Sequence, residues 1–213
     1  AEAIDAAADD PVQVRKFTAR LAAEAQRLAG LTSRIMDLSR VQAAEELTTA
    51  GPVSIDEVIT TSLEAHVVQA ESAEVELVRG GQRSAQVVGD VQMLTEAVSN
   101  LIANAIAYSP VGAHVGVGVR TIDGIVEIAV TDQGIGIAEA DQQRIFERFY
   151  RADQARSRRT GGTGLGLAIV KHVAQRHDGE VRVWSQPGRG STFTLRIPEG
   201  GPATPPQNRS NLS

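Results

Sequence analysis

The chain has 213 residues, of which 42% are hydrophobic and 22% charged, proportions typical of a globular protein. The formal net charge of −5 argues against a general nucleic-acid-binding protein, and we expect no nucleic-acid partner. The absence of cysteine excludes disulfides, thiolate catalysis and cysteine-based zinc sites. No apolar run reaches the roughly 18 residues of a membrane-spanning helix. Because the chain begins with Ala, we expect a longer protein whose missing N-terminal part makes any membrane contact.

Residues 1–44 predict part of a helical hairpin. Between Val14 and Leu38, apolar residues recur in alternating steps of three and four, which is a heptad pattern. This pattern predicts a helix over about 11–42 that packs along a partner helix. A helix that lies on its own domain is the alternative. Residues 45–53 predict a polar linker.

Residues 54–198 alternate between helical and strand patterns, which is typical of an α/β domain. Helices are predicted at 54–69, where Ser54 and Glu57 form a capping box, and at 90–107, 139–149 and 164–177. Strands are predicted at 75–78, 86–88, 115–120, 125–131, 180–185 and 191–197. The tail over 199–213 is rich in Pro, Ser and Asn, and we expect it to be disordered.

A glycine cluster, GGTGLGLAIV over 161–170, leads into one of these helices. Leu167 stands where a Walker loop needs Lys and where a dinucleotide fingerprint needs its third Gly, so neither motif fits. The glycines still allow the backbone to approach phosphates, and the following helix directs its N-terminal amides toward an anion. A glycine-rich connector is the alternative interpretation.

A second glycine-containing segment follows the predicted strand over 125–131. Asp132 at the end of that strand can accept a hydrogen bond from a purine amino group. Gly134 and Gly136 are expected to leave room for a flat base. A plain turn between a strand and a helix is the alternative.

Two asparagines lie on one face of the helix over 90–107. Asn100 and Asn104 are four residues apart on an otherwise apolar face, where amides are costly without partners. An amide oxygen is a suitable ligand for Mg²⁺, which also binds phosphate oxygens. A hydrogen-bonded pair of structural amides is the alternative.

Two aromatic residues, Phe146 and Phe149, lie beside Arg148 and Arg151, just before an arginine-rich loop. Guanidinium groups suit the charge of phosphate. The alternative is an aromatic anchor for the loop, with solvated arginines.

Taken together and in this order, the segments resemble the ATP-binding domain of bacterial two-component sensor histidine kinases. The matching segments are NLIANAIAYSP (100–110), DQGIGI (132–137), FERFYR (146–151), GGTGLGLAIV (161–170) and GRGSTFTLRIP (188–198). The LSRVQ ending of the N-terminal helix resembles the second helix of the dimerisation and phosphotransfer hairpin. Extended similarity indicates the phosphate-sensing PhoR-type branch.

The resemblance implies an α/β (α+β) sandwich of the Bergerat ATP-binding type, with a mobile lid over about 138–163. It implies that Asn104 holds Mg²⁺, that Asn100 positions metal, water and phosphate, and that Asp132 bonds the adenine amino group. Arg148 or Arg151 is expected near the phosphates. The remaining residues expected at the nucleotide are Tyr108, Gly134, Gly136, Ile137, Gly162, Gly164, Leu165, Gly166 and Thr192.

The resemblance further implies a function. The domain binds Mg-ATP and transfers the γ-phosphoryl group to a histidine, for relay to an aspartate on a response-regulator receiver domain. The expected setting is the cytoplasmic portion of a membrane-anchored, homodimeric sensor. The alternatives are a conformational ATPase of the gyrase or MutL type, in which a Glu usually stands at the Asn100 position, and a degenerate nucleotide-binding and dimerisation module.

Two features depart from the family pattern. Ala107 stands where many members carry Lys or Arg, which removes one phosphate contact. The phosphoacceptor sequence is absent, so we expect no autophosphorylation of this chain alone. We expect surface or packing roles, not catalytic ones, for the four histidines, which are His66, His114, His172 and His177.

Overall fold

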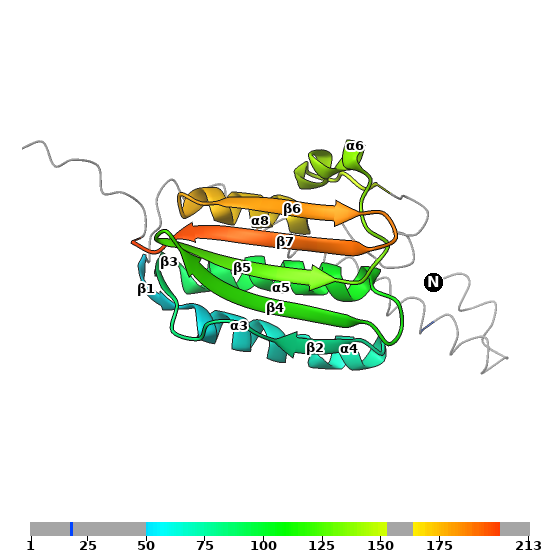
Figure 1. Ribbon diagram of the computed structural model, residues 1–213, viewed down its shortest axis with the longest axis horizontal. Coiled ribbons are helices and arrows are strands. Elements are labelled where there is room, and N and C mark those ends of the chain that lie inside the picture. The colour runs from blue at the N-terminus through cyan, green and yellow to red at the C-terminus, as the bar shows by residue number, and fades with distance from the viewer. Residues whose placement is uncertain (1–17, 19–49, 153–163, 201–213) are drawn as a thin grey trace, which may run out of the picture. The chain divides into compact units, whose positions relative to one another are not determined.

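The computed structural model describes residue 18 and residues 50–152 and 164–200 (Figure 1). Apart from Thr18, the predicted N-terminal hairpin lies outside the described residues. Most of the arginine-rich loop, including Gly162, and nearly all of the predicted tail lie outside them too.

A five-stranded mixed sheet is the framework of the described part of the chain, with strand order β2-β4-β5-β7-β6. Its strands are β2 (Glu76–Arg79), β4 (His114–Ile122), β5 (Ile125–Asp132), β6 (Glu180–Gln186) and β7 (Gly190–Pro198). β2 runs parallel to β4, and the other neighbouring pairs are antiparallel. Asp123 and Gly124 both have positive φ in the turn between β4 and β5, as the predicted hairpin requires.

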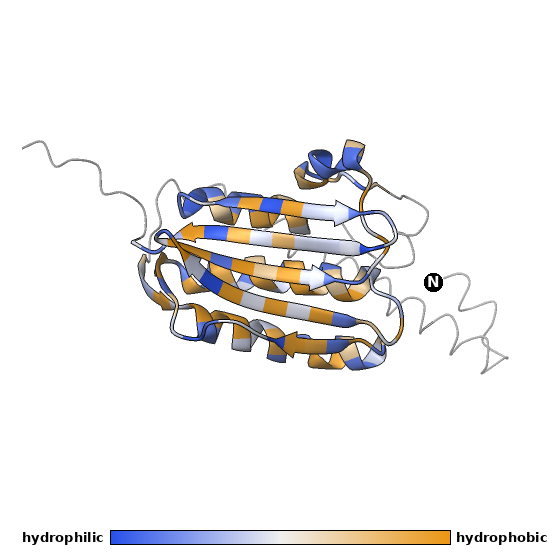
Figure 2. Ribbon diagram, viewed as in Figure 1, coloured by the Kyte–Doolittle hydropathy of each residue, from blue (hydrophilic) through white to orange (hydrophobic). Residues whose placement is uncertain are grey.

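Helices cover one face of this sheet (Figure 1). They are α3 (Ile55–Glu64), α4 (Val67–Ser72), α5 (Val91–Tyr108) and α8 (Gly166–Arg176). The short α6 (Glu139–Gln142) and the 3₁₀ helix η1 (Arg144–Phe146) lie beyond β6. Hydropathy varies from residue to residue along the strands (Figure 2). One set of strand side chains, which includes Val117, Ile128 and Leu195, is buried, as is Leu101 of α5. The predicted α/β class is therefore confirmed.

The helix predicted over 54–69 is divided at His66. Its start is confirmed, because the Glu57 amide donates to Ser54 Oγ (3.4 Å). At the break, the His66 amide bonds to the carbonyl of Leu63 instead of that of Ser62. The imidazole Nδ1 of His66 takes up the Ser62 carbonyl instead (2.7 Å). The side chain thus replaces a helical backbone bond, and a separate helix, α4, follows.

Two further predictions need correction. The end of the predicted linker forms strand β1 (Gly51–Ser54), which pairs antiparallel with β3 (Gln86–Gly89) in a second, two-stranded sheet. The helix predicted over 139–149 is reduced to α6 and η1, because Glu147 is extended and Phe149 has a φ of 63°. A positive φ is incompatible with a continuing right-handed helix.

A buried histidine joins α8 to the start of α5. His177 Nε2 accepts the Asp90 amide (3.0 Å), and Nδ1 bonds to the Val173 carbonyl (2.8 Å). Burial lowers the pKa of His177, in keeping with a neutral ring that uses one nitrogen as donor and the other as acceptor. A Cβ at Gly89 would lie 2.4 Å from Nε2, so the ring fits only beside glycine. The packing role expected for His177 agrees with this geometry.

Candidate nucleotide-binding site

The predicted adenine ligand, Asp132, ends β5 on the helix-covered side of the sheet, and only 6% of it is exposed. Its Oδ1 accepts the amides of Gly134 (2.8 Å) and Ser191 (3.2 Å), which fixes the carboxylate and leaves Oδ2 with acceptor capacity. Burial raises the pKa of the Asp132 carboxyl, although both amide bonds act in the opposite direction. A buried, oriented acceptor of this kind suits a purine amino group.

Two serines that the sequence interpretation missed support this carboxylate. Ser191 lies opposite Asp132 in the register of β5 and β7, and its hydroxyl lies 2.9 Å from that of Ser185. The Ser185 hydroxyl also accepts the amide of Ile137 (2.8 Å). Ile137, predicted at the nucleotide, is therefore tied to Asp132 through two hydroxyl groups. Ser191 could have been found from the sequence, because residues alternate between the two faces along the predicted strand 191–197.

Thr192, in contrast, does not lie beside Asp132. It is opposite Thr131, and the two hydroxyl groups are 3.0 Å apart. Because successive residues of a strand point to opposite faces, the side chains of Asp132 and Ser191 share one face and that of Thr192 lies on the other. This geometry does not support Thr192 as the residue near the base; it supports Ser191 as the neighbour of Asp132.

Gly134 and Gly136 are required by close contacts within the protein. A Cβ at Gly134 would lie 2.6 Å from the carbonyl oxygen of Tyr108, and one at Gly136 would lie 2.1 Å from that of Gln186. Gly136 also has a φ of 67°. The expectation that these glycines leave open space for a base is therefore corrected: they let the loop after β5 pack against the end of α5 and the end of β6. The contact with Gly134 places Tyr108 beside the Asp132 loop.

The asparagine pair lies along α5, and Asn100 faces the start of α8. The Asn100 amide donates to the Glu96 carbonyl of its own helix (3.0 Å), and its Oδ1 would lie 2.9 Å from a Cβ at Gly166. Gly166 thus allows α8 to begin directly against Asn100. The side-chain amide of the half-buried Asn104 makes no hydrogen bond with any described residue. The alternative of a mutually bonded structural pair is not what the geometry shows.

The two ends of the predicted lid meet at Phe149 and Gly164. The Phe149 amide donates to the Gly164 carbonyl (2.9 Å), and Gly164 has a φ of 71°. Leu165 is fully buried, so its side chain packs in the core, while Arg148 is exposed. Within the described residues, Nη2 of Arg151 is buried and has no hydrogen-bond partner. An unpaired buried guanidinium nitrogen is costly, and an anionic ligand would satisfy it.

The residues present fit a nucleotide and a metal. Asp132 offers an acceptor, Asn104 offers a free amide, and Arg151 offers a donor. The described residues contain no group of three His, Cys, Asp or Glu side chains that could hold a metal ion. A metal here would depend on amide oxygen and phosphate oxygens, a ligand set that suits Mg²⁺.

Comparison with known proteins identifies the family. Residues 89–201, which include all the candidate site residues named above, match the family described as histidine kinase-, DNA gyrase B-, and HSP90-like ATPase. The chain belongs to this family. It contains the ATP-binding catalytic domain of a sensor histidine kinase. Relatives among known sequences and solved structures are named sensor histidine kinases.

Three relatives show how similar this sensor kinase domain is to known proteins. The sensor-like histidine kinase SenX3 of Mycolicibacterium smegmatis is 51% identical over 199 residues, which cover 93% of this chain and 52% of that protein. The mycobacterial sensor histidine kinase MprB is 38% identical with a TM-score of 0.61, over 72% of this chain and 98% of that structure. Full-length ShkA in complex with AMPPNP is 26% identical with a TM-score of 0.75, over 87% of this chain and 39% of that structure.

The chain spans about half the length of the SenX3 relatives that it matches (52% and 48%). Among the described residues, no helix has the length and apolar character needed to cross a bilayer.

Proposed function

We propose that this histidine kinase domain delivers the γ-phosphoryl group of ATP to a histidine that lies outside the described residues. ATP supplies the phosphoryl group, and Mg²⁺ neutralises phosphate charge. Asp132 orients the adenine, Asn104 holds the metal, and Arg151 contacts phosphate. Phosphoryl transfer depends mainly on positioning and charge neutralisation, which a site built of amides, glycines and arginine supplies.

The observation that carries this proposal is the amide at Asn100, held by Glu96 and packed against Gly166. The family also contains ATPases, which need a base to activate water. An amide cannot accept a proton, so the position provides no such base. This favours transfer to a protein histidine over hydrolysis.

The wider setting is also a proposal. The SenX3 relative, which is 51% identical, is a PhoR-like sensor kinase. This favours the PhoR-type branch that the sequence indicated. We infer relay to a response-regulator aspartate, a homodimer formed through the helical hairpin, and membrane anchoring through a further part of the protein. Ala107, in the last turn of α5, supplies no cation to the phosphates.

A transfer assay tests the proposal. The chain would be mixed with Mg-ATP labelled on the γ-phosphate and with a separate hairpin that carries the acceptor histidine. We expect label on the hairpin, no label on the chain alone, and loss of transfer in Asn104→Ala.

The remaining outcomes of this assay distinguish the alternatives. Release of free phosphate without label on the hairpin would indicate a conformational ATPase. Absence of nucleotide binding would indicate a degenerate module. Label on any histidine of the chain alone would contradict the expected lack of autophosphorylation.

A further inference from the structure

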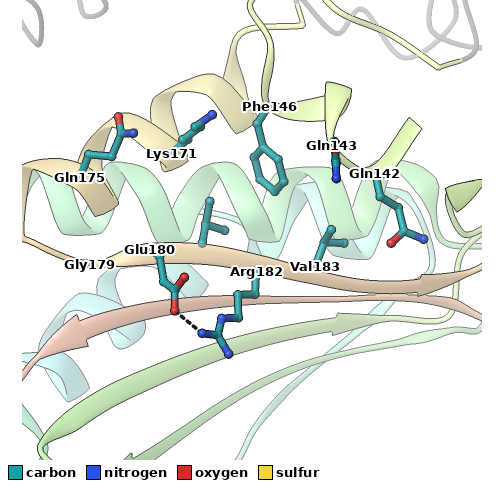
Figure 3. A pocket seen from close by; sticks show the side chains of 10 residues that line it. Gln142, Gln143, Phe146, Lys171, Gln175, Gly179, Glu180, Arg182 and Val183 are labelled. Carbon is teal, nitrogen blue, oxygen red and sulfur yellow. Dashed lines mark ion pairs between the residues drawn. The ribbon is translucent and has the colours of Figure 1, made fainter. Parts of the chain in front are cut away.

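A groove runs along the edge of the sheet at β6, apart from the residues assigned to the nucleotide (Figure 3). Its volume is about 590 Å³, and it lies between β6 on one side and α8, α6 and η1 on the other. In the described part of the chain, β7 is the sole strand paired with β6, so the other edge of β6 faces this groove. None of the residues predicted to bind nucleotide lines it.

The backbone of β6 presents hydrogen-bonding groups to the groove. Gln142 Nε2 donates to the Ser185 carbonyl (3.0 Å), which shows that this carbonyl points away from β7. Peptide groups alternate in direction along a strand, so those of Val181 and Val183 point outward as well. Gln142 therefore occupies one end of the edge, and the outward peptide groups at Val181 and Val183 remain available to an added strand.

The side chains give this edge an apolar floor with a polar rim. Val181, Val183 and Phe146 are half-buried and line the groove. Phe146 is fixed from below by an edge-to-face contact with Phe193, with ring centroids 6.4 Å apart. In Figure 3, the side chains of Gln175 and Lys171 line the opposite side of the groove, on α8. The groove is open to solvent and is not a closed cavity.

The charge of the groove is set by Lys171. Glu180 also lines the groove, but it forms ion pairs with both Arg182 (2.6 Å) and Arg196. These arginines lower the pKa of Glu180, with Arg182 the larger cause, so its charge is already compensated. Lys171 is exposed and forms no ion pair with a described residue. Among the described residues that line the groove, Lys171 is therefore the cation available to a ligand.

We propose that this groove binds an extended acidic peptide segment of a partner protein, which adds a strand to β6. The partner backbone pairs with the outward peptide groups of Val181 and Val183, apolar side chains rest on Phe146, and a carboxylate meets Lys171. At about 3.3 Å per residue, the strand over 180–183 accommodates roughly four residues of such a segment. None of the residues assigned to the nucleotide lines this surface, although Gln142 and Phe146 belong to the segment predicted as the ATP lid.

Titration with synthetic peptides tests the proposal on the whole chain. The probe is an acetylated and amidated peptide of about seven residues in which Thr alternates with Val, Glu and Val, so that the three groove-facing side chains lie on one side. The signals are the amide shifts of residues 180–183 and the fluorescence of the exposed Trp184. We expect saturable binding that is at least about fivefold weaker when Lys replaces Glu.

Charge reversal supplies the decisive variant. Lys171→Glu should reverse the preference between the two peptides, whereas Arg189→Glu, the same charge change in the turn after β6, should not. Both variants should keep the melting temperature and ATP affinity of the parent. Four results would overturn the proposal: no saturable shift, binding unaffected by Lys171→Glu, peptide competition with ATP, or self-association of the chain through β6.

Discussion

At the scale of single residues, the site depends on which side chains share the face of Asp132. The buried carboxylate is held by Gly134 and Ser191, and a second serine, Ser185, supports Ser191. These contacts fix the direction of an acceptor before any ligand arrives. Such preorganisation reduces the ordering cost of binding.

Asp132→Asn should weaken ATP binding without destabilising the fold. The neutral amide keeps an oxygen for the Gly134 and Ser191 amides, but it loses the charged acceptor, a loss of about 1.5–3 kcal/mol or roughly 10- to 100-fold in affinity. Because burial raises the pKa of Asp132, removing its charge also removes a desolvation cost. Calorimetric titration with ATP and a thermal melt measure the two effects. A variant that binds normally would refute the assignment.

Two adjacent residues of β7 should respond differently to loss of a hydroxyl group. Ser191→Ala removes support from Asp132 and should weaken ATP binding by about 1 kcal/mol, or roughly fivefold. Thr192→Val lies on the other face of the sheet and should leave the affinity unchanged. A fluorescent-nucleotide displacement assay compares the two. The reverse order of effects would restore Thr192 to the base and contradict the observed register.

At the scale of elements, α5 and α8 are joined at two points that lie far apart along each helix. One is Asn100 against Gly166, and the other is the bond between His177 and Asp90. These two contacts hold both ends of α8 against α5. The site therefore depends on the spacing between the two helices. Changes at either contact should alter nucleotide binding or stability.

Gly166→Ala should disturb the first contact. Its Cβ would lie 2.9 Å from Asn100 Oδ1, so α8 or the amide must move, which we expect to lower ATP affinity by about fivefold or more. Gly116→Ala in β4 is the matched control, because a Cβ there meets no atom within 4 Å. Equal affinities of the two variants would show that the close approach of α8 to Asn100 is not needed.

The second contact predicts a pH dependence. The pKa of His177 is lowered in the folded state, so the unfolded state binds the proton more readily. Its contribution to the unfolding free energy is therefore fully present above about pH 6.5 and is lost as the pH falls toward the folded pKa. The lowered pKa values of Glu127 and Glu180 act in a separate window, below about pH 4.5.

Urea unfolding at several pH values measures this slope. His177→Gln should be less stable at pH near 7.5, because the half-buried Asp90 amide loses its fitted acceptor. The variant should also lose the parent's slope below about pH 6.5. A variant that retains the parent slope would assign the titration to another group.

The elements show what sequence can and cannot predict. The helix from Asp90 was predicted to within one residue, because its cap and periodicity are local features. The pairing of β1 with β3 was not predicted, since it joins segments more than thirty positions apart. The resemblance alone placed Thr192 near the base, and only the strand register shows that its neighbour Ser191 shares the face of Asp132.

At the scale of the whole molecule, the order of motifs predicted the family and fold better than any single residue did. Asn100, Asp132 and Gly166 come from separate elements, and the sheet brings the loop of β5 to the end of α5. The groove at β6 left no motif in the sequence, because a strand edge that no described strand pairs with is a property of the completed sheet. We therefore propose two binding surfaces for this chain, one for nucleotide and one for a peptide.

A crystal structure with Mg²⁺ and a non-hydrolysable ATP analogue tests the central claim most directly. We predict the adenine amino group within hydrogen-bond distance of the Asp132 carboxylate and the metal bound to Asn104 Oδ1. Adenine against Thr192, metal held elsewhere, or nucleotide in the groove at β6 would contradict the account.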